Sequence, residues 1–421
     1  MSKGVSAWWL LIALLFGVGV GGYFAPDWKA NPGGQISESQ RGSLPILPPL
    51  PKSPPPPDDE HVRHVWPGME IQDVLEAAAT DPAHKVVRVH EGVYCPRQHA
   101  QAMIYFNARH DGITLEAEGE VILTAANPEI ADPTVMSFPA VVNHVVYFGD
   151  GVTRKTAIRG FKITGARNFM TFSDSPLIEA APAVPALSAK RWVYYADGGG
   201  IKIWGRASPW IDRVEIYDSY TFPCAGAISI DNRGHLKEVP LITNSIFRNN
   251  RSQWTGSAID MFGPGNAGEI RNCLFVGNVA NRGYYTETPP PKFHDENGSG
   301  ALTIFPGSAV IVDHCTFTGN YNGVDDESIG SIYTNCIFWK NDARGGVAPG
   351  KRYEMDIRDA SNVNNCWFGG NEVLDLRGTI STTRNVFDAP DPEFDEAYRP
   401  RCAKYADVGY RPVGDPAAPA P

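Results

Sequence analysis

The chain has 421 residues, with 37 Lys and Arg against 47 Asp and Glu, for a net charge of -10. An acidic chain without a basic cluster disfavours nucleic acid as a partner, because phosphate backbones are held by basic surfaces. Hydrophobic residues at 43% and charged residues at 20% describe a globular chain, which excludes a wholly disordered one. The 42 Gly and 35 Pro exceed ordinary usage, so the chain turns often and long helical bundles are not expected.

The most apolar run comes first: residues 7–25 read AWWLLIALLFGVGVGGYFA, without a charge. As a helix this run spans about 28 Å, close to the ~30 Å core of a bilayer. It is a single transmembrane anchor or a cleaved signal peptide, and the aromatic residues at both ends favour the anchor. Lys3 keeps residues 1–6 in the cytoplasm. We therefore expect a single-pass protein of the bacterial inner (cytoplasmic) membrane, with the folded domain in the periplasm.

Gly17 and Gly21 form a G-x-x-x-G pair within this run. Such a pair lets another transmembrane helix pack closely, although Gly is also simply common in membrane helices. Residues 26–65 follow as a Pro-rich linker that contains LPILPPLPKSPPPPDDE. This composition favours an extended polyproline II spacer, either an inert tether or a segment that lies along a partner.

From residue 66 the pattern becomes that of a folded domain. Ile71, Val74, Leu75 and Ala78 fall on one face of a short helix, and strands follow at 86–94 and 113–125. Beyond them two short motifs repeat. A small-residue corner runs into a strand in GGGIKIW (198–204), AGAISID (225–231), SAIDMF (257–262) and GALTIF (300–305). A strand ends in F-x-x-N in NSIFRNN (244–250), NCLFVGN (272–278), HCTFTGN (314–320), NCIFWKN (335–341) and NCWFGGN (365–371).

A repeat this short cannot close its own core, so it must stack on its neighbours as a β-solenoid. Equivalent side chains then lie ~4.8 Å apart. This stacking predicts an inward column of Cys273, Cys315, Cys336 and Cys366, buried as small apolar residues or bridged in an oxidising compartment. It also predicts a ladder of turn amides that are hydrogen-bonded along the solenoid axis, formed by Asn272, Asn335 and Asn365.

These repeats resemble those of the right-handed parallel β-helix proteins of the pectate-lyase-like superfamily, whose capping helix and first strand the segment 66–94 resembles. The G-[GS]-A-[IL] and F-x-x-N motifs are also similar to the repeats of chlamydial polymorphic membrane proteins. The resemblance implies an all-β fold: a right-handed parallel β-helix over 66–390 with a short N-terminal capping helix, preceded by the transmembrane helix. Insertions lie at 166–197 and 279–297, and residues 391–421 form a C-terminal tail.

Many relatives of that fold are polysaccharide lyases or hydrolases, which need clustered carboxylates, often with Ca²⁺. Aligned corner strands place Lys202, Ser229, Asp260 and Thr303 in one outward column. Asp231 lies in the next outward column, so Asp231 and Asp260 could oppose each other across a substrate. They are the best candidate catalytic pair, and we find no constellation typical of pectate lyases or polygalacturonases.

Asp325, Asp326 and Glu327 form a dense acidic group that we place in a loop. Such a group is a candidate Ca²⁺ site or, more simply, a solvated acidic turn. No cofactor is otherwise expected.

The loop insertions leave the solenoid at one edge and bring many aromatic residues to it. A face rich in Tyr and Trp is typical of a binding surface for protein or sugar. The predicted binding face comprises Trp192, Tyr194, Tyr195, Tyr220, Phe222, Trp254, Tyr284, Tyr285, Phe293 and Tyr321. A second outward row, Ile246, Leu274, Ile337 and Trp367, is ordinary strand composition or a flat docking surface.

Two hypotheses follow. The first is a non-catalytic scaffold or accessory subunit that docks onto and stabilises an integral membrane protein complex through the N-terminal helix and the loop face. The alternative is a membrane-tethered protein that binds or degrades polysaccharide, with Asp231 and Asp260 as its acidic pair.

Overall fold

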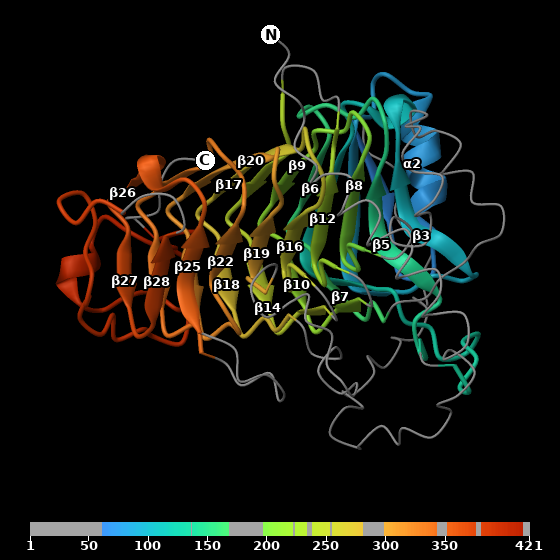
Figure 1. The fold of residues 1–421 in the computed structure, drawn as a ribbon. Coiled ribbons are helices and arrows are strands. Elements are labelled where there is room, and N and C mark those ends of the chain that lie inside the picture. Colours follow the sequence, from blue (N-terminus) through green and yellow to red (C-terminus); the bar gives the residue numbers. More distant parts are fainter. Residues whose placement is uncertain are drawn as a thin grey trace, which may run out of the picture.

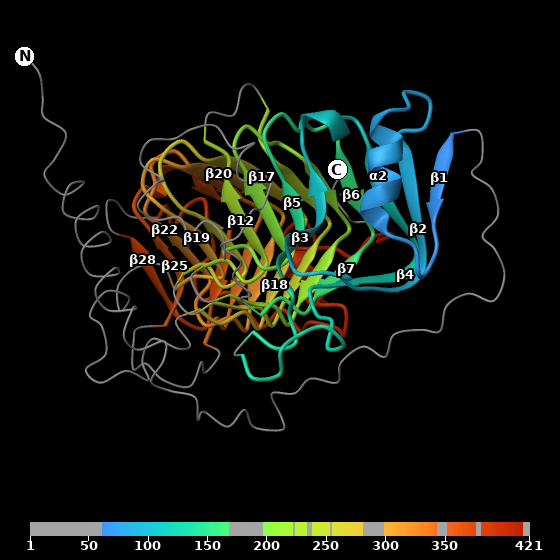
Figure 2. The ribbon, with the colours of Figure 1, turned by 90° about the vertical axis from the view of Figure 1, so that its right-hand side faces the viewer.

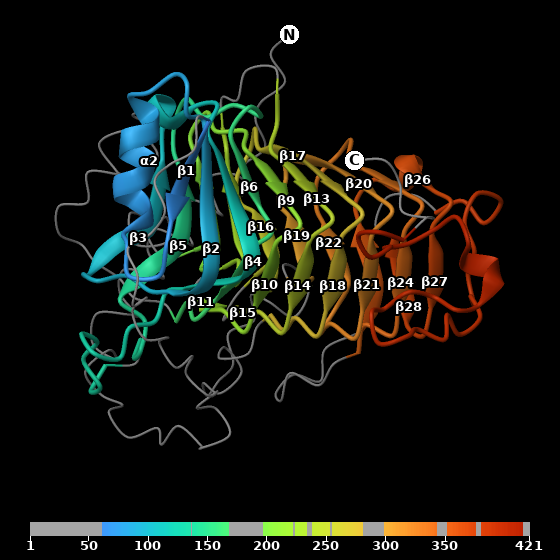
Figure 3. The same ribbon diagram turned by 180° about the vertical axis from the view of Figure 1, so that it is seen from behind.

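The computed structural model describes residues 61–135, 137–167, 197–221, 224–233, 238–252, 255–280, 299–342, 352–375 and 380–415. These residues coil into a solenoid, and its named strands pair in parallel (Figures 1 and 3). Each coil contributes short strands to three ladders, which we call sheets I, II and III. The all-β, parallel solenoid predicted from the repeats is confirmed over these residues.

Sheet I is nine-stranded and contains β3 (Ala100–Phe106), β5 (Val142–Phe148), β8 (Ile201–Trp204), β12 (Ile228–Asp231), β16 (Ile259–Met261), β19 (Leu302–Ile304), β22 (Val324–Asp326), β25 (Tyr353–Ile357) and β28 (Glu372–Asp375). Sheets II and III share the long strands at the N-terminal end, β2 (Val86–Tyr94) and β4 (Thr114–Thr124), and the short β1 (Val62–Val65) pairs with the first half of β2. Beyond β4 they diverge, because the first half of β4 pairs with β6 and the second half with β7.

Sheet II continues through β6 (Ala157–Arg159), β9 (Trp210–Asp212), β13 (Leu241–Thr243), β17 (Ala267–Arg271), β20 (Ala309–Asp313), β23 (Ile332–Thr334) and β26 (Val363–Asn364). Sheet III continues through β7 (Lys162–Thr164), β10 (Glu215–Tyr217), β14 (Ile246–Arg248), β18 (Leu274–Val276), β21 (Thr316–Thr318), β24 (Ile337–Trp339) and β27 (Trp367–Gly369). A small separate ladder joins β11 (Tyr220–Thr221) to β15 (Arg251–Ser252). Short 3₁₀ turns occur at Ala108–His110 (η2), Ala360–Asn362 (η6) and Ala403–Tyr405 (η7).

The helix α2 (Ile71–Ala79) covers the N-terminal end of the core, as the sequence pattern predicts (Figure 2). Ile71, Leu75 and Ala78 are buried in the same cluster as the strand side chains, and Val74 packs against it. A solenoid leaves an open apolar end, so an amphipathic helix here removes that surface from water.

The F-x-x-N motif builds the interior. Its Phe rings, Phe247, Phe275, Phe317, Phe338 and Phe368, stack with centroids 4.3 to 5.0 Å apart. Its Asn side chains stack as well. The Nδ2 of Asn278 donates to Oδ1 of Asn320 (2.9 Å), and the Nδ2 of Asn320 donates to Oδ1 of Asn341 (2.7 Å). These fully buried amides also donate to backbone carbonyls, so they satisfy the turn between coils.

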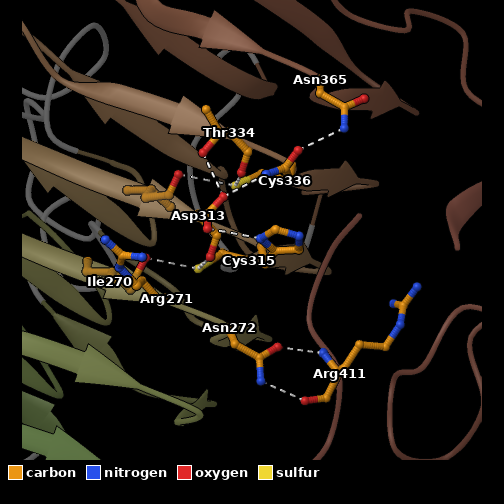
Figure 4. Close-up of polar contacts among 12 residues, drawn as sticks. Ile270, Arg271, Asn272, Asp313, Cys315, Thr334, Cys336, Asn365 and Arg411 are labelled. Carbon is orange, nitrogen blue, oxygen red and sulfur yellow. Dashed lines mark hydrogen bonds and ion pairs between the residues drawn. The ribbon is translucent and has the colours of Figure 1, made fainter. Parts of the chain in front are cut away.

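The first residue of each F-x-x-N segment adopts a left-handed backbone, with φ of 50 to 56° at Asn244, Asn272, His314, Asn335 and Asn365. Asn tolerates this conformation better than most residues, which explains its recurrence. Asn365 Nδ2 donates to Oδ1 of Asn335 at 2.8 Å, as expected (Figure 4). Because His314 occupies the intervening coil, the ladder is not continuous: Asn272 bonds instead to Asn244 and to the backbone of Arg411.

The predicted Cys column is confirmed. Cys273, Cys315, Cys336 and Cys366 are fully buried and none forms a disulfide. Their thiols donate to backbone carbonyls, for instance Cys336 Sγ to Val312 O at 3.7 Å (Figure 4). Burial raises the pKa of Cys315, Cys336 and Cys366, so these thiols are buried apolar groups rather than nucleophiles.

Of the two interpretations of the outward row on sheet III, a free docking surface is wrong, because the chain itself covers the row. Residues 389–415, most of which belong to the predicted C-terminal tail at 391–421, fold back over the outer face of this sheet. Ile337 packs with Tyr405 and Val408, and Leu274 packs with Tyr410. Gly409 has φ of 78° and approaches so closely that a Cβ there would lie 2.3 Å from Cδ1 of Ile337. No sequence repeat marks this segment, so strand alternation alone could not reveal the cover.

Among the residues that the structure describes, no helix is long and apolar enough to span a membrane. The predicted anchor, residues 7–25 with Gly17 and Gly21, lies outside the described residues.

Candidate functional site

The polar outer column of sheet I is the candidate site. Strand pairing places Lys202 beside Ser229, Ser229 beside Asp260, and Asp260 beside Thr303. The column predicted from the sequence is therefore confirmed, and it continues to Asp325 and Asp356. Unexpectedly for an outer face, the side chains from Lys202 to Asp356 are all buried, at 4% exposure or less.

The Gly-rich corner before each strand contributes to this burial by folding over the column. A Cβ on Gly198 would lie 2.9 Å from Cβ of Ser229, and one on Gly256 would lie 2.6 Å from Cβ of Asp260. Only a residue without a side chain permits the backbone to approach so closely. The repeated Gly and Ala of the corners thus have a structural role beyond turning the chain.

Asp197 binds two members of the column from the first corner. Its Oδ1 accepts from Lys202 Nζ at 2.6 Å, and its Oδ2 accepts from the Ser229 hydroxyl at 2.7 Å. Lys202 Nζ also donates to Ser229 Oγ at 3.0 Å, and it lies 5.2 Å from the centre of the Trp204 ring. The buried ammonium is therefore paired and hydrogen-bonded, as a buried charge must be.

Thr255 occupies the equivalent place two coils further on, five residues before Asp260 as Asp197 is five before Lys202. Its hydroxyl lies 2.7 Å from Asp260 Oδ2 and 3.0 Å from Cys224 Sγ. Asp260 Oδ1 is buried and has no hydrogen-bond partner among the described side chains and backbone. Burial, with Asp197 nearby, raises the pKa of Asp260 to about 8, so this carboxyl is protonated at neutral pH. Burial likewise raises the pKa of the Cys224 thiol.

Asp231 is the other member of the predicted catalytic pair, and the structure does not bring it to an open site. Arg233 donates two hydrogen bonds to its carboxylate, from Nε to Oδ1 at 2.6 Å and from Nη2 to Oδ2 at 3.0 Å. Asp231 is buried, which raises its pKa although Arg233 opposes the shift. Asp231 and Asp260 are thus two internally bonded carboxyls, not a pair facing each other across a substrate cleft.

The acidic group at 325–327 is not a loop, and this expectation is wrong. Asp325 and Asp326 belong to β22, so their side chains point to opposite faces. Asp325 Oδ2 accepts from the hydroxyl of Tyr353 at 3.1 Å, whereas Asp326 Oδ2 accepts from that of Tyr333 at 2.7 Å. Among the described residues no group of three or more His, Cys, Asp or Glu could hold a metal ion. The alternation separates Asp325 from Asp326, so the two do not form one site with Glu327.

Most of the predicted aromatic face lies outside the described residues. This applies to Trp192, Tyr194, Tyr195, Phe222, Trp254, Tyr284, Tyr285 and Phe293. Of the two that are described, Tyr220 is half-buried in β11. Tyr321 is buried beneath Arg352, whose guanidinium carbon lies 3.7 Å from the ring centre. Tyr321 therefore holds a corner in place and does not present its ring to a partner.

Sequence reasoning missed the corner residues Asp197, Cys224 and Thr255. The signal was present, because each stands five residues before a member of the outward column. It also missed the outer face of sheet II, whose stacked residues Trp210, Leu241, Glu269, Ile311 and Ile332 each stand three residues before the left-handed turn residue.

The comparisons with known proteins agree with this geometry. A family model described as a right handed beta helix region matches residues 199–387. Together with the three parallel ladders, this match identifies the chain as a right-handed parallel β-helix protein. No curated protein and no solved structure shows a significant match to the chain. The likeness to chlamydial repeats stays a resemblance.

Proposed function

We propose that this β-helix is a non-catalytic scaffold, tethered to a membrane by residues 7–25, which docks onto and stabilises an integral membrane protein complex. The observation that carries the proposal is the sealed outer column of sheet I. A polysaccharide-cleaving site needs carboxyl groups within hydrogen-bond reach of a sugar. In this chain Asp260 and Asp231 are buried, and their carboxyl groups are hydrogen-bonded to Thr255 and Arg233, respectively.

The stacked interior supports a bracing role. The Phe, Asn and Cys columns repeat along several coils, so the body is a stiff rod whose shape does not depend on a ligand. The uncharged run at 7–25, with Gly17 and Gly21 on one helical face, supports association with other transmembrane helices. The loop edge next to Tyr220 is the expected contact for the periplasmic part of the partner.

The test is purification of the tagged full chain from its native membranes in mild detergent. We expect integral membrane subunits to co-purify in fixed proportion. Gly17→Leu with Gly21→Leu should release them, because bulky side chains block close helix packing, whereas Gly19→Leu on the opposite face should not. A lone monomer in every preparation contradicts the proposal.

The alternative, polysaccharide binding or degradation, has one observation in its favour: a carboxyl kept protonated at neutral pH, as Asp260 is, suits a general acid. It requires the corner at 255–258, which covers Asp260, to lift from the column. Cleavage of an acidic polysaccharide by the wild type, lost in Asp260→Asn, would favour this alternative over the scaffold.

A further inference from the structure

The outer face of sheet II carries a continuous stripe along the solenoid. Successive register pairs join one residue from each of nine strands: Val62, Val86, Thr114, Ala157, Trp210, Leu241, Glu269, Ile311 and Ile332. At the ~4.8 Å spacing of paired strands, the eight steps from Val62 to Ile332 cover about 38 Å. We call this column the sheet II stripe. Apart from Ala157, its members are half-buried.

The one charge in the stripe is neutralised. Glu269 lies 3.2 Å from Arg154 and 3.6 Å from Arg271. Trp210 is held in place, because its Nε1 donates to Thr243 at 2.9 Å and the Arg159 guanidinium lies 4.2 Å from its ring. The stripe is thus a fixed, largely apolar strip, in contrast to the sealed face of sheet I and the covered row of sheet III.

An open depression of about 510 Å³ adjoins the far end of the stripe. Ala267 and Ala309 line it, two residues before Glu269 and Ile311 in the same strands. Ile329 also lines it and is 61% exposed, more than any other large hydrophobic residue that the structure describes. Such exposure of a large aliphatic side chain beside an apolar strip marks a surface that another segment covers.

We propose that the chain's own Pro-rich segment, residues 44–57, lies along the sheet II stripe as a polyproline II helix. The described chain begins at this surface, because Val62 at the start of β1 is the first member of the stripe. At ~3.1 Å per residue the twelve steps from Leu50 to Val62 cover about 37 Å, which matches the length of the stripe, and residues 44–49 extend past Ile332.

The composition of the segment fits the same position. It reads LPILPPLPKSPPPP, with Leu44, Ile46, Leu47 and Leu50 in its first half. Leu50 would lie beside Ile332, and the other three would continue past it. A segment with so few backbone N–H groups cannot add a strand, but it can cross strands at right angles and bury its side chains. Because a Pro-rich segment is already extended as polyproline II, its docking costs little further conformational entropy.

This placement reverses the direction of the tether. The chain upstream of residue 44 would emerge past Ile332, towards the far end of the solenoid, instead of near α2. The docked segment would therefore hold that end towards whatever residues 1–43 are attached to. The inference concerns the isolated chain and does not depend on the proposed scaffold function.

Trypsin offers a direct test on the purified full chain, because Lys52 lies inside the segment and Arg41 outside it. We expect cleavage after Lys52 to be on the order of tenfold slower than cleavage after Arg41, the effect of burying one or two apolar side chains. Leu241→Asp with Ile311→Asp should abolish this protection. The matched control Ile130→Asp, at an exposed site away from the stripe, should retain it.

A cross-link tests the register without weakening the face. At ~3.1 Å per residue Ser53 lies about 28 Å along the segment from Val62, and Leu241 is five strand steps, about 24 Å, from it. Ser53→Cys with Leu241→Cys should therefore cross-link rapidly. Ser53→Cys alone and Ser53→Cys with Ile246→Cys, on sheet III, should not.

Equal cleavage at Lys52 and Arg41, or equal cross-linking in all three variants, overturns the proposal. So does protection of Lys52 that appears only when membrane subunits are bound, since the stripe would then belong to a partner protein.

Discussion

Replacing Asp260 by Asn tests whether this carboxyl is held protonated in the folded chain. Asp260 is fully buried, with Thr255 at Oδ2 and no partner at Oδ1 among the described residues. Asn is close in shape to a protonated Asp and cannot ionise. The substitution therefore removes the titration and leaves the Thr255 hydroxyl a carbonyl oxygen to bind.

The stability that Asp260 contributes should fall as the pH rises, because its pKa is higher in the folded than in the unfolded chain. The pKa of Asp260 rises from 3.8 in the unfolded chain to about 8 in the folded one. The folded state thus holds a proton that the unfolded state releases, and the stability from this group is complete below about pH 4 and lost by about pH 8. At ~1.4 kcal/mol per unit, the wild type loses roughly 4 kcal/mol through Asp260 between about pH 5 and pH 8.

Urea unfolding of both chains at several pH values measures this difference. The free energy of unfolding of Asp260→Asn, relative to the wild type, should rise by roughly 4 kcal/mol over that range and then stay level. Asp150→Asn is the control, because Arg206 lowers the pKa of Asp150, which is then ionised in both states above about pH 5. A difference for Asp260→Asn that does not change with pH would refute a protonated Asp260.

Further predictions concern the ladders, the C-terminal segment and the thiols. Asn320→Ala should destabilise the chain by about 3–5 kcal/mol in urea unfolding, because it removes bonds to Asn278, Phe275 and Asn341, whereas Asn365→Ala, on the exposed ladder, should remove about 1 kcal/mol. Gly409→Ala should speed tryptic cleavage after the exposed Arg401 and Lys404 through its clash with Ile337, while Gly414→Ala, with open space around it, should do so much less. A thiol reagent should reach Cys95 and Cys402 first and the five buried cysteines only on unfolding, and fast labelling of Cys315 in the native chain would contradict the buried column.

The repeat made the architecture predictable from sequence. Once Ile201, Ile228 and Ile259 are aligned as inward residues, the position of Lys202, Ser229 and Asp260 follows from strand alternation alone. The same holds for the Cys and Phe columns, because identical residues at one register must stack. Capping by α2 was readable because its apolar face has helical spacing.

What lies outside the repeat was not predictable. Residues 389–415 cover sheet III without any periodic signal, so the row from Leu274 to Ile337 looked exposed. The acidic group at 325–327 looked like a loop because Asp is uncommon in strands, yet Tyr333 and Tyr353 provide hydroxyl donors for it. In both cases the deciding contacts come from residues distant in sequence.

The sealed column changes how outward carboxylates on a β-helix are interpreted. An Asp on the outer face of a strand reaches solvent only if nothing lies above it. Here the Gly corners bring backbone within contact distance of Ser229 and Asp260, and the residues five before the column supply its hydrogen-bond partners. A catalytic site would need the opposite arrangement, with corners bulky enough to stay clear of the column and carboxyl oxygens left for a substrate. The small residues of the corner motif, which first indicated the solenoid, are therefore also the sequence feature that argues most directly against catalysis on sheet I.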